Sequence, residues 1–126
     1  MIGKSRNMEL VRISKEMEDL CYKVIGICME VHTEVGPGFP EEYYQRALEI
    51  EFGEARIPFV AQCPIPVVYK RIQIGLNYLD FLIDNKLVLE IKSTNAVTNV
   101  HLFQTLKYLG YTKLDVALLV NFGREK

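Results

Sequence analysis

Residues 78–92 read YLDFLIDNKLVLEIK and contain two short apolar stretches that predict neighbouring strands. Strand side chains alternate between two faces, so the odd-numbered apolar residues of both strands are expected on one buried face. These residues are Leu79, Phe81, Ile83, Leu87, Leu89 and Ile91. Burying both sets on the same side requires Phe81 opposite Leu89, with a three-residue loop over 84–86 or a bulge between the strands.

The same register places Asp80 opposite Glu90 on the other side of the sheet, with Lys92 two residues beyond. Two carboxylates about 5 Å apart on neighbouring strands repel each other, and a divalent cation relieves that repulsion. Magnesium prefers carboxylate oxygens and keeps several waters, and manganese suits similar ligands. A nearby lysine can orient or help to deprotonate water, or stabilise charge on a phosphate. The pattern therefore predicts a metal site for phosphate-ester chemistry.

A structural alternative is equally compatible with the alternation. Asp80 and Glu90 would flank a salt bridge with Lys92 on a solvated sheet face. Three predicted helices for one sheet favour a helix over this face, and charge beneath a helix is usually functional.

Three helices are expected from apolar residues at a spacing of three and four. The first covers 15–35 with Ser14 as its cap, and the turn Gly36-Pro37-Gly38 follows it. The second runs over 40–53, with Pro40 in its first turn. The third covers 98–109, with Thr98 as a cap and Gly110 as its stop.

Two further strand regions are expected at 57–69 and 114–121, and the prolines of the first region restrict it to a sheet edge or interrupt it. The prediction is a single α/β domain over 14–126, with a mixed central β-sheet flanked by helices. Residues 1–13 lack clear periodicity and are expected to form a flexible segment.

Composition sets further bounds. The chain has 126 residues, 49% of them hydrophobic, which is enough for one core. A net charge of −1 gives no general sign of a nucleic-acid partner, so that reading must rest on a local site. Cys21, Cys28 and Cys63 lack CxxC spacing and are expected to be reduced in a cytoplasmic protein. Neither a membrane span nor a signal peptide is expected.

Asp80 followed by Glu90-Ile91-Lys92 resembles the core motif of the PD-(D/E)XK nuclease superfamily. Residues 38–44, GFPEEYY, match the signature of the GxxExxY family of small prokaryotic proteins. Residues 104–108, QTLKY, resemble the Gln-x-x-x-Tyr element of the exonuclease branch, and residues 118–123, LLVNFG, are also similar to the family. The resemblance spans roughly 15–123 and implies a restriction-endonuclease-like core.

The resemblance implies roles for individual residues. Asp80 and Glu90 would bind the metal with the Ile91 carbonyl, and Lys92 would be the catalytic lysine. The residues expected to join or support the site from the helices are Glu41, Tyr44, His101, Gln104 and Tyr108. Spacing alone places Glu41 beside Tyr44, and His101 on one face with Gln104 and Tyr108. The alternatives are a first-turn acid at Glu41, core packing for the tyrosines, and a surface role for His101.

The resulting hypothesis is a magnesium-dependent nuclease that hydrolyses phosphodiester bonds in DNA or RNA. The alternative is a non-catalytic binding or regulatory module that retains the fold. A homodimer could cover the substrate. Lys70-Arg71 beside Tyr69 could touch a phosphate backbone or form a solvated hairpin tip.

Overall fold

The computed structural model describes residues 2–3, 5–6, 9–10 and 13–123, and side chains from residue 13 to residue 123. The expected flexible segment 1–13 lies largely outside the described residues and stays a prediction. The elements are β1 (Ile2–Gly3), β2 (Ser5–Arg6), β3 (Glu9–Leu10), α1 (Lys15–Val35), α2 (Glu41–Glu54), β4 (Phe59–Tyr69), β5 (Ile72–Ile83), β6 (Leu87–Lys92), α3 (Asn99–Thr112) and β7 (Val116–Asn121).

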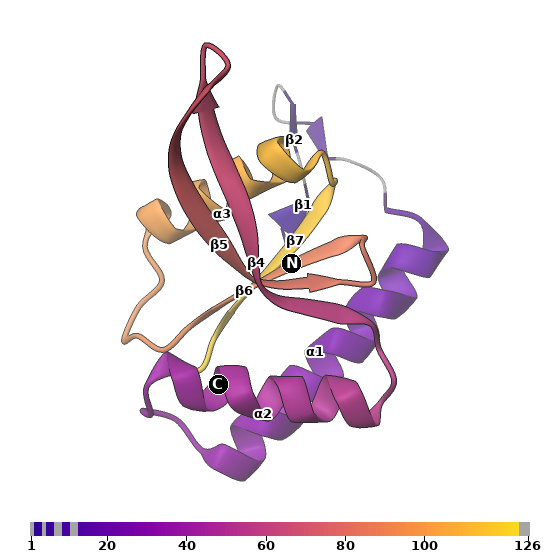
Figure 1. The fold of residues 1–126 in the computed structure, drawn as a ribbon. Helices are drawn as coiled ribbons and strands as arrows, with labels where there is room; N and C mark the ends of the chain where they lie inside the picture. Colours follow the sequence, from indigo (N-terminus) through magenta and orange to yellow (C-terminus); the bar gives the residue numbers. More distant parts are fainter. Residues whose placement is uncertain (1, 4, 7–8, 11–12, 124–126) are drawn as a thin grey trace.

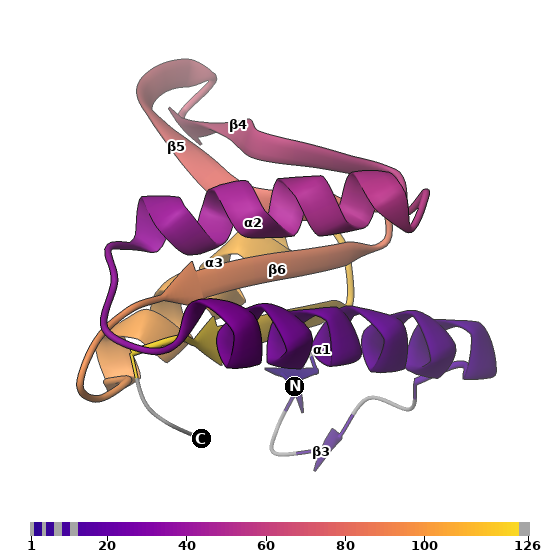
Figure 2. The same ribbon diagram turned by 90° about the horizontal axis from the view of Figure 1, so that it is seen from below.

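A mixed five-stranded sheet forms the centre, in the order β1-β7-β6-β5-β4. β6 and β7 are parallel, whereas β4, β5 and β6 are antiparallel neighbours. α1 and α2 lie side by side on one side of the sheet and α3 lies on the other (Figures 1 and 2). The expected single α/β domain with a mixed sheet between helices is therefore confirmed, and so is the edge position of β4.

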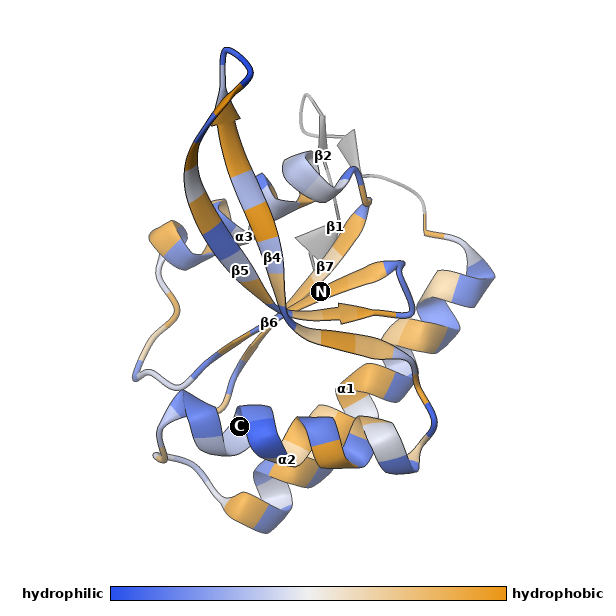
Figure 3. Ribbon diagram, viewed as in Figure 1, coloured by the Kyte–Doolittle hydropathy of each residue, from blue (hydrophilic) through white to orange (hydrophobic). Residues whose placement is uncertain are grey.

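Two apolar cores occupy the two faces of the sheet. The larger core joins α1 and α2 to the sheet through residues that include Val24, Leu48, Phe52, Phe81 and Leu89. The smaller core lies under α3 and contains Ile65, Leu79, Val88, Tyr108, Leu109 and Ala117. Figure 3 shows the apolar inner strands between these layers, with hydrophilic residues at the turns. Burial on both faces is what makes β6 continuously apolar except at Glu90 and Lys92.

The predicted register of the 78–92 segment is confirmed. Phe81 lies opposite Leu89, and Ile83 lies opposite Leu87. Asp84 and Asn85 have φ values of 51° and 54°, and the Lys86 N–H donates to the Ile83 carbonyl at 2.9 Å. Positive φ at both central residues is the mark of a type I′ hairpin turn. Lys86 is the additional loop residue that the register requires.

The expected position of Leu79 is wrong. Phe81 and Ile83 pack into the larger core, but Leu79 packs into the core under α3. The change of face coincides with Gln62 on β4, whose φ is 51° and which lies between the paired residues Ala61 and Cys63. A left-handed residue inside a strand bends it and increases its twist, so the faces of both strands change at this point.

Beyond this bend, β4 and β5 continue past the other strands as a two-stranded ribbon (Figure 1). Lys70 and Arg71 close it with φ values of 48° and 70°, which confirms that they form a hairpin tip. One face of the ribbon presents four exposed apolar side chains, those of Ile72, Ile74, Leu76 and Tyr78.

The helix predictions hold with one exception. The Ser14 hydroxyl caps α1 by accepting from the Met17 N–H at 3.1 Å. The prediction that Gly110 stops the third helix is wrong, because α3 continues to Thr112. Lys113 follows as the C-cap residue, with a φ of 59°. The Thr112 hydroxyl donates to the Tyr108 carbonyl at 2.9 Å and so satisfies an acceptor of the last turn.

The three cysteines are free, and Cys21 and Cys28 are buried. Within the described residues, no helix is long and apolar enough to cross a membrane.

Asn121 fastens the loop after β6 to the end of β7. Its side-chain oxygen accepts from the N–H groups of Thr94, at 3.1 Å, and Gly123, at 2.9 Å. Its amide donates to the Thr94 carbonyl at 3.0 Å. A Cβ atom at Gly123 would overlap the backbone of Thr94, so only glycine fits at this close approach.

Gly123→Ala should therefore lower the free energy of unfolding by about 1–3 kcal/mol through overpacking. Gly110→Ala is the matched control, since a Cβ there meets open space in a helix. It should raise stability by about 0.5–1 kcal/mol. Urea unfolding measures both, and equal stabilities of the two variants would contradict this account of the Thr94–Gly123 contact.

Candidate functional site

The candidate site lies where β5 and β6 separate. Between these strands, backbone pairing in the described structure runs from Ile83–Leu87 to Phe81–Leu89 and stops there. At the next position the Asp80 N–H donates to Glu90 Oε1 at 3.0 Å, and the Ile91 N–H donates to Asp80 Oδ2 at 2.8 Å. Each carboxylate thus accepts from the backbone of the opposite strand. These two hydrogen bonds hold the acids side by side at the point where the strands separate.

Two glutamines complete the surroundings of Asp80, and sequence analysis missed both. Gln62 Nε2 donates to Asp80 Oδ1 and to Gln45 Oε1, each at 3.4 Å. Gln45 of α2 reaches the Asp80 carbonyl at 3.5 Å. These are long, weak hydrogen bonds. The one sequence signal for Gln62 was its place opposite Asp80 in the β4–β5 register. That register could be assigned only with knowledge of the bend at Gln62.

The buried acid is Glu90, which is 6% exposed. Burial, and next the negative charge of Asp80, raise the pKa of Glu90 to about 8, while the charge of Lys92 opposes the shift. Removal from water disfavours a carboxylate, and a second carboxylate close by disfavours it further. At neutral pH the acid pair therefore holds a proton that a cation could replace.

Lys92 ends β6 and is half-buried. The ion pairs within 4 Å among the described residues are Lys15–Asp19 and Lys86–Asp84, so Lys92 forms none. The alternative of a structural salt bridge from Lys92 to Asp80 or Glu90 is therefore not found in this part of the chain. Its ammonium is close enough to act on the pKa of Glu90 but is not bound to either acid.

α3 covers the acid pair, as expected from the number of helices. Gln104 Nε2 donates to the Tyr108 hydroxyl at 3.2 Å. Burial, and then the charge of Glu90, raise the pKa of Tyr108, and Asp80 adds to the shift. The structure therefore brings Asp80, Glu90, Lys92, Gln104 and Tyr108 together.

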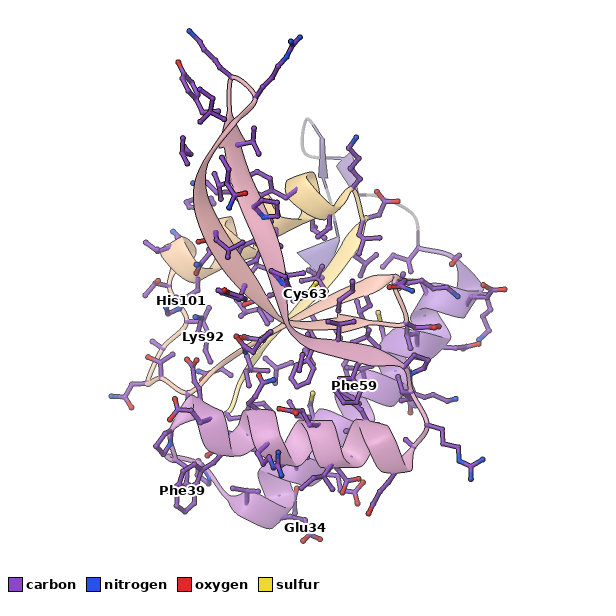
Figure 4. All side chains as sticks on the ribbon, in the orientation of Figure 1. Glu34, Phe39, Phe59, Cys63, Lys92 and His101 are labelled. Carbon is purple, nitrogen blue, oxygen red and sulfur yellow. The ribbon has the colours of Figure 1, made fainter. Side chains whose placement is uncertain are left out.

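Two predicted residues have other contacts. Tyr44 is fully buried, its hydroxyl donates to the Gly36 carbonyl at 2.6 Å, and its ring stacks on Phe122 at 4.5 Å. Core packing with a hydrogen-bonded hydroxyl is what the structure describes for this tyrosine. His101 Nδ1 accepts from the Thr98 N–H at 3.2 Å in a capping box. Figure 4 labels His101 in the first turn of α3 and Lys92 at the end of β6.

The expected cluster of three carboxylates is not formed. Over residues 13–123, no group of three or more His, Cys, Asp or Glu side chains could hold a metal ion. Glu41 begins α2, but the α2 side chain that reaches Asp80 is Gln45, one turn later. Two carboxylates still fit magnesium, because this ion is commonly bound through one or two carboxylates and keeps several waters. The Ile91 carbonyl stays a predicted third ligand.

Comparison with known proteins gives one match. The family model described as the PD-(D/E)XK nuclease superfamily matches residues 18–126. This range includes Glu41, Asp80, Glu90, Lys92, Gln104 and Tyr108. Neither the curated proteins nor the solved structures contain a match.

The raised pKa of Glu90 predicts a pH-dependent stability. Its folded pKa is about 8 and its ordinary value is 4.5, so the fold accommodates the protonated form better than the charged form. The free energy of unfolding should therefore fall as pH rises from about 4.5 to about 8. Asp80→Asn removes the neighbouring charge and should reduce this fall, which raises stability near the upper end of the range.

Asp84→Asn is the control, because it makes the same chemical change in the exposed 84–86 loop. Chemical unfolding of the metal-free protein across this pH range measures the effect. An identical pH dependence in both variants would show that Asp80 does not set the pKa of Glu90.

Proposed function

Because the chain belongs to the PD-(D/E)XK nuclease superfamily, we propose that it is a magnesium- or manganese-dependent nuclease that hydrolyses phosphodiester bonds in nucleic acid. The observation that carries the proposal is the placement of Asp80 beside the buried Glu90, where Glu90 accepts from the Asp80 N–H and Asp80 accepts from the Ile91 N–H. Lys92 ends the same strand as Glu90 and forms no ion pair with the residues that the structure describes. A buried acid such as Glu90 is costly without a ligand, and perturbed acids of this kind are concentrated at functional sites.

Each residue has a proposed role. Asp80 and Glu90 bind the cation together with the Ile91 carbonyl. When bound, the cation neutralises charge on the phosphate oxygens and lowers the pKa of a coordinated water. Lys92 orients the attacking water and stabilises negative charge that develops on the phosphate. Because the protein only needs to position these groups, no covalent intermediate is required.

The helices supply supporting roles in this proposal. Gln104 and Tyr108, already hydrogen-bonded to each other, position the substrate phosphate from α3. Glu41, at the first turn of α2, is the outer acid that approaches when metal and substrate bind. His101 supports the site by capping α3, and Tyr44 supports it by fixing the start of α2.

We also propose membership of the prokaryotic GxxExxY family. The signature residues have clear physical tasks that support this assignment. Gly38 has a φ of 92°, which favours glycine. The Tyr44 hydroxyl bridges the Gly36 carbonyl and the Phe39 N–H across the same turn. A cytoplasmic location belongs to the same proposal and is supported by the three free cysteines.

The second candidate function is a binding or regulatory module that keeps the fold without catalysis. The observation in its favour is that two carboxylates, rather than three, gather at the site in the described structure. This candidate expects metal or nucleic-acid binding without cleavage.

Lys92→Ala should reduce cleavage by roughly a hundredfold or more, as for a lost group that stabilises transition-state charge. Magnesium should raise the melting temperature of wild type and of this variant alike, because binding to the folded state alone stabilises it. Asp80→Asn should lose most of that increase. Lys86→Ala is the control, since Lys86 lies in the exposed hairpin loop.

Cleavage of single- and double-stranded DNA and RNA and thermal unfolding with millimolar magnesium or manganese provide these data. A wild-type protein that binds metal without cleaving any substrate would favour the regulatory module. Equal cleavage by the Lys92 and Lys86 variants would remove Lys92 from the catalytic group.

We further propose that two copies associate through the β4–β5 ribbon. Within the part of the chain that the structure describes, β5 pairs with β6 only at residues 81–83, so residues 72–79 have a free edge there and an exposed apolar face. The β4 edge carries Pro64 and Pro66, which obstruct pairing there. Over residues 59–79, charges occur only at Lys70 and Arg71, so a two-fold pairing of this face brings few like charges together.

Light scattering at micromolar concentration should report a dimer for wild type and a monomer for Ile74→Glu. Tyr22→Glu is the control, because Tyr22 is exposed on α1. A monomeric wild type would contradict the proposed dimer.

A further inference from the structure

A cavity lies between the β4–β5 ribbon and α3. The cavity has a volume of about 480 Å³, which lies within the usual range for ligand pockets. Its polar and aromatic lining consists of Asn77, Phe103, Gln104, Lys107, Tyr108 and Tyr111. Figure 1 shows the ribbon passing in front of α3, which supplies most of this lining.

The cavity and the candidate site share two residues. Gln104 and Tyr108 line the cavity and are hydrogen-bonded to each other at 3.2 Å. Burial raises the pKa of Tyr108, and the charges of Glu90 and Asp80 raise it further. A molecule seated in the cavity would therefore contact Tyr108, on which the charges of the acid pair act, on the sheet face that α3 covers.

The outer wall of the cavity carries aromatic rings with a cation between them. Phe103 is 63% exposed and Tyr111 is 47% exposed, although both are large apolar side chains. Lys107 lies midway, so the three residues follow one another at a spacing of four along the same side of α3. Exposed aromatic rings that alternate with a basic residue suit stacked bases and their phosphates.

We propose that the cavity binds an unpaired base next to the scissile phosphate, so that the substrate is single-stranded nucleic acid. The base stacks on Phe103 or Tyr111, its polar edge meets the amides of Asn77 and Gln104, and Lys107 contacts a neighbouring phosphate. This inference rests on the proposed nuclease function. It deepens that proposal by naming the substrate class.

A duplex fits these features poorly. Its bases are stacked on one another and offer no free face to an aromatic side chain. Duplex binding also depends on many phosphate contacts from a broad basic surface, whereas this chain has a net charge of −1.

The test measures binding by fluorescence anisotropy without metal, so that cleavage does not interfere. The probes are short labelled single strands of DNA and RNA and a duplex of equal length. Wild type should bind a single strand more tightly than the duplex, and the DNA and RNA probes identify which sugar is preferred. Phe103→Ala and Tyr111→Ala should each weaken single-strand binding by roughly tenfold, which corresponds to the loss of one stacked base.

Tyr22→Ala is the matched control, because Tyr22 is an aromatic residue that is 83% exposed on α1. Lys107→Ala should reduce the salt dependence of binding, as expected for a lost phosphate contact. Thermal unfolding establishes that the variants are folded. Duplex binding as tight as single-strand binding, or aromatic variants that bind like the control, would overturn the inference.

Failure of the proposed function gives a different result. If the protein binds single strands through Phe103 and Tyr111 but does not cleave them with magnesium, the cavity assignment stands and the nuclease proposal fails. If it cleaves nucleic acid and the aromatic variants keep the KM of wild type, the nuclease proposal stands and the cavity assignment fails.

Discussion

The structure depends on two hydrogen bonds at the point where β5 leaves β6, from the Asp80 N–H to Glu90 and from the Ile91 N–H to Asp80. Each carboxylate accepts a backbone N–H from the opposite strand, at 3.0 Å and 2.8 Å. The acids thereby satisfy donors that would otherwise remain unpaired where the strands part. The same two hydrogen bonds hold the half-buried Asp80 beside the buried Glu90, which is unfavourable while both carboxyl groups are charged.

The separation of the strands organises the rest of the molecule. Before it, β5 contributes Phe81 and Ile83 to the core beneath α1 and α2. After it, Leu79 turns to the core beneath α3, and β5 continues with β4 as the projecting ribbon. The acid pair thus lies at the boundary between the two cores, where α3 covers it and the ribbon and α3 enclose the neighbouring cavity. A site at this boundary is held by both cores.

Much of this arrangement could be predicted from the sequence because it follows from alternation. The apolar residues of β5 and β6 determine the register of Phe81 and Leu89, and with it the pairing of the acids. The change of face at Leu79 could not be predicted, because the left-handed conformation of Gln62 has no signal in residue type. The continuation of α3 past Gly110 was also missed, since a single glycine is tolerated inside a helix. The contacts of Gln45 and Gln62 with Asp80 depend on the tertiary packing of α2 and β4, which short-range patterns do not report.

The central claim is that the Asp80–Glu90 pair holds a proton that a divalent cation replaces. The most direct test is calorimetric titration of magnesium at pH 7 in buffers of different ionisation enthalpy, which counts the protons released on binding. Since the pKa of Glu90 is about 8, the account predicts release of nearly one proton per bound ion at pH 7 and progressively less above pH 8. Magnesium binding at pH 7 without proton release, or no binding at all, would contradict it.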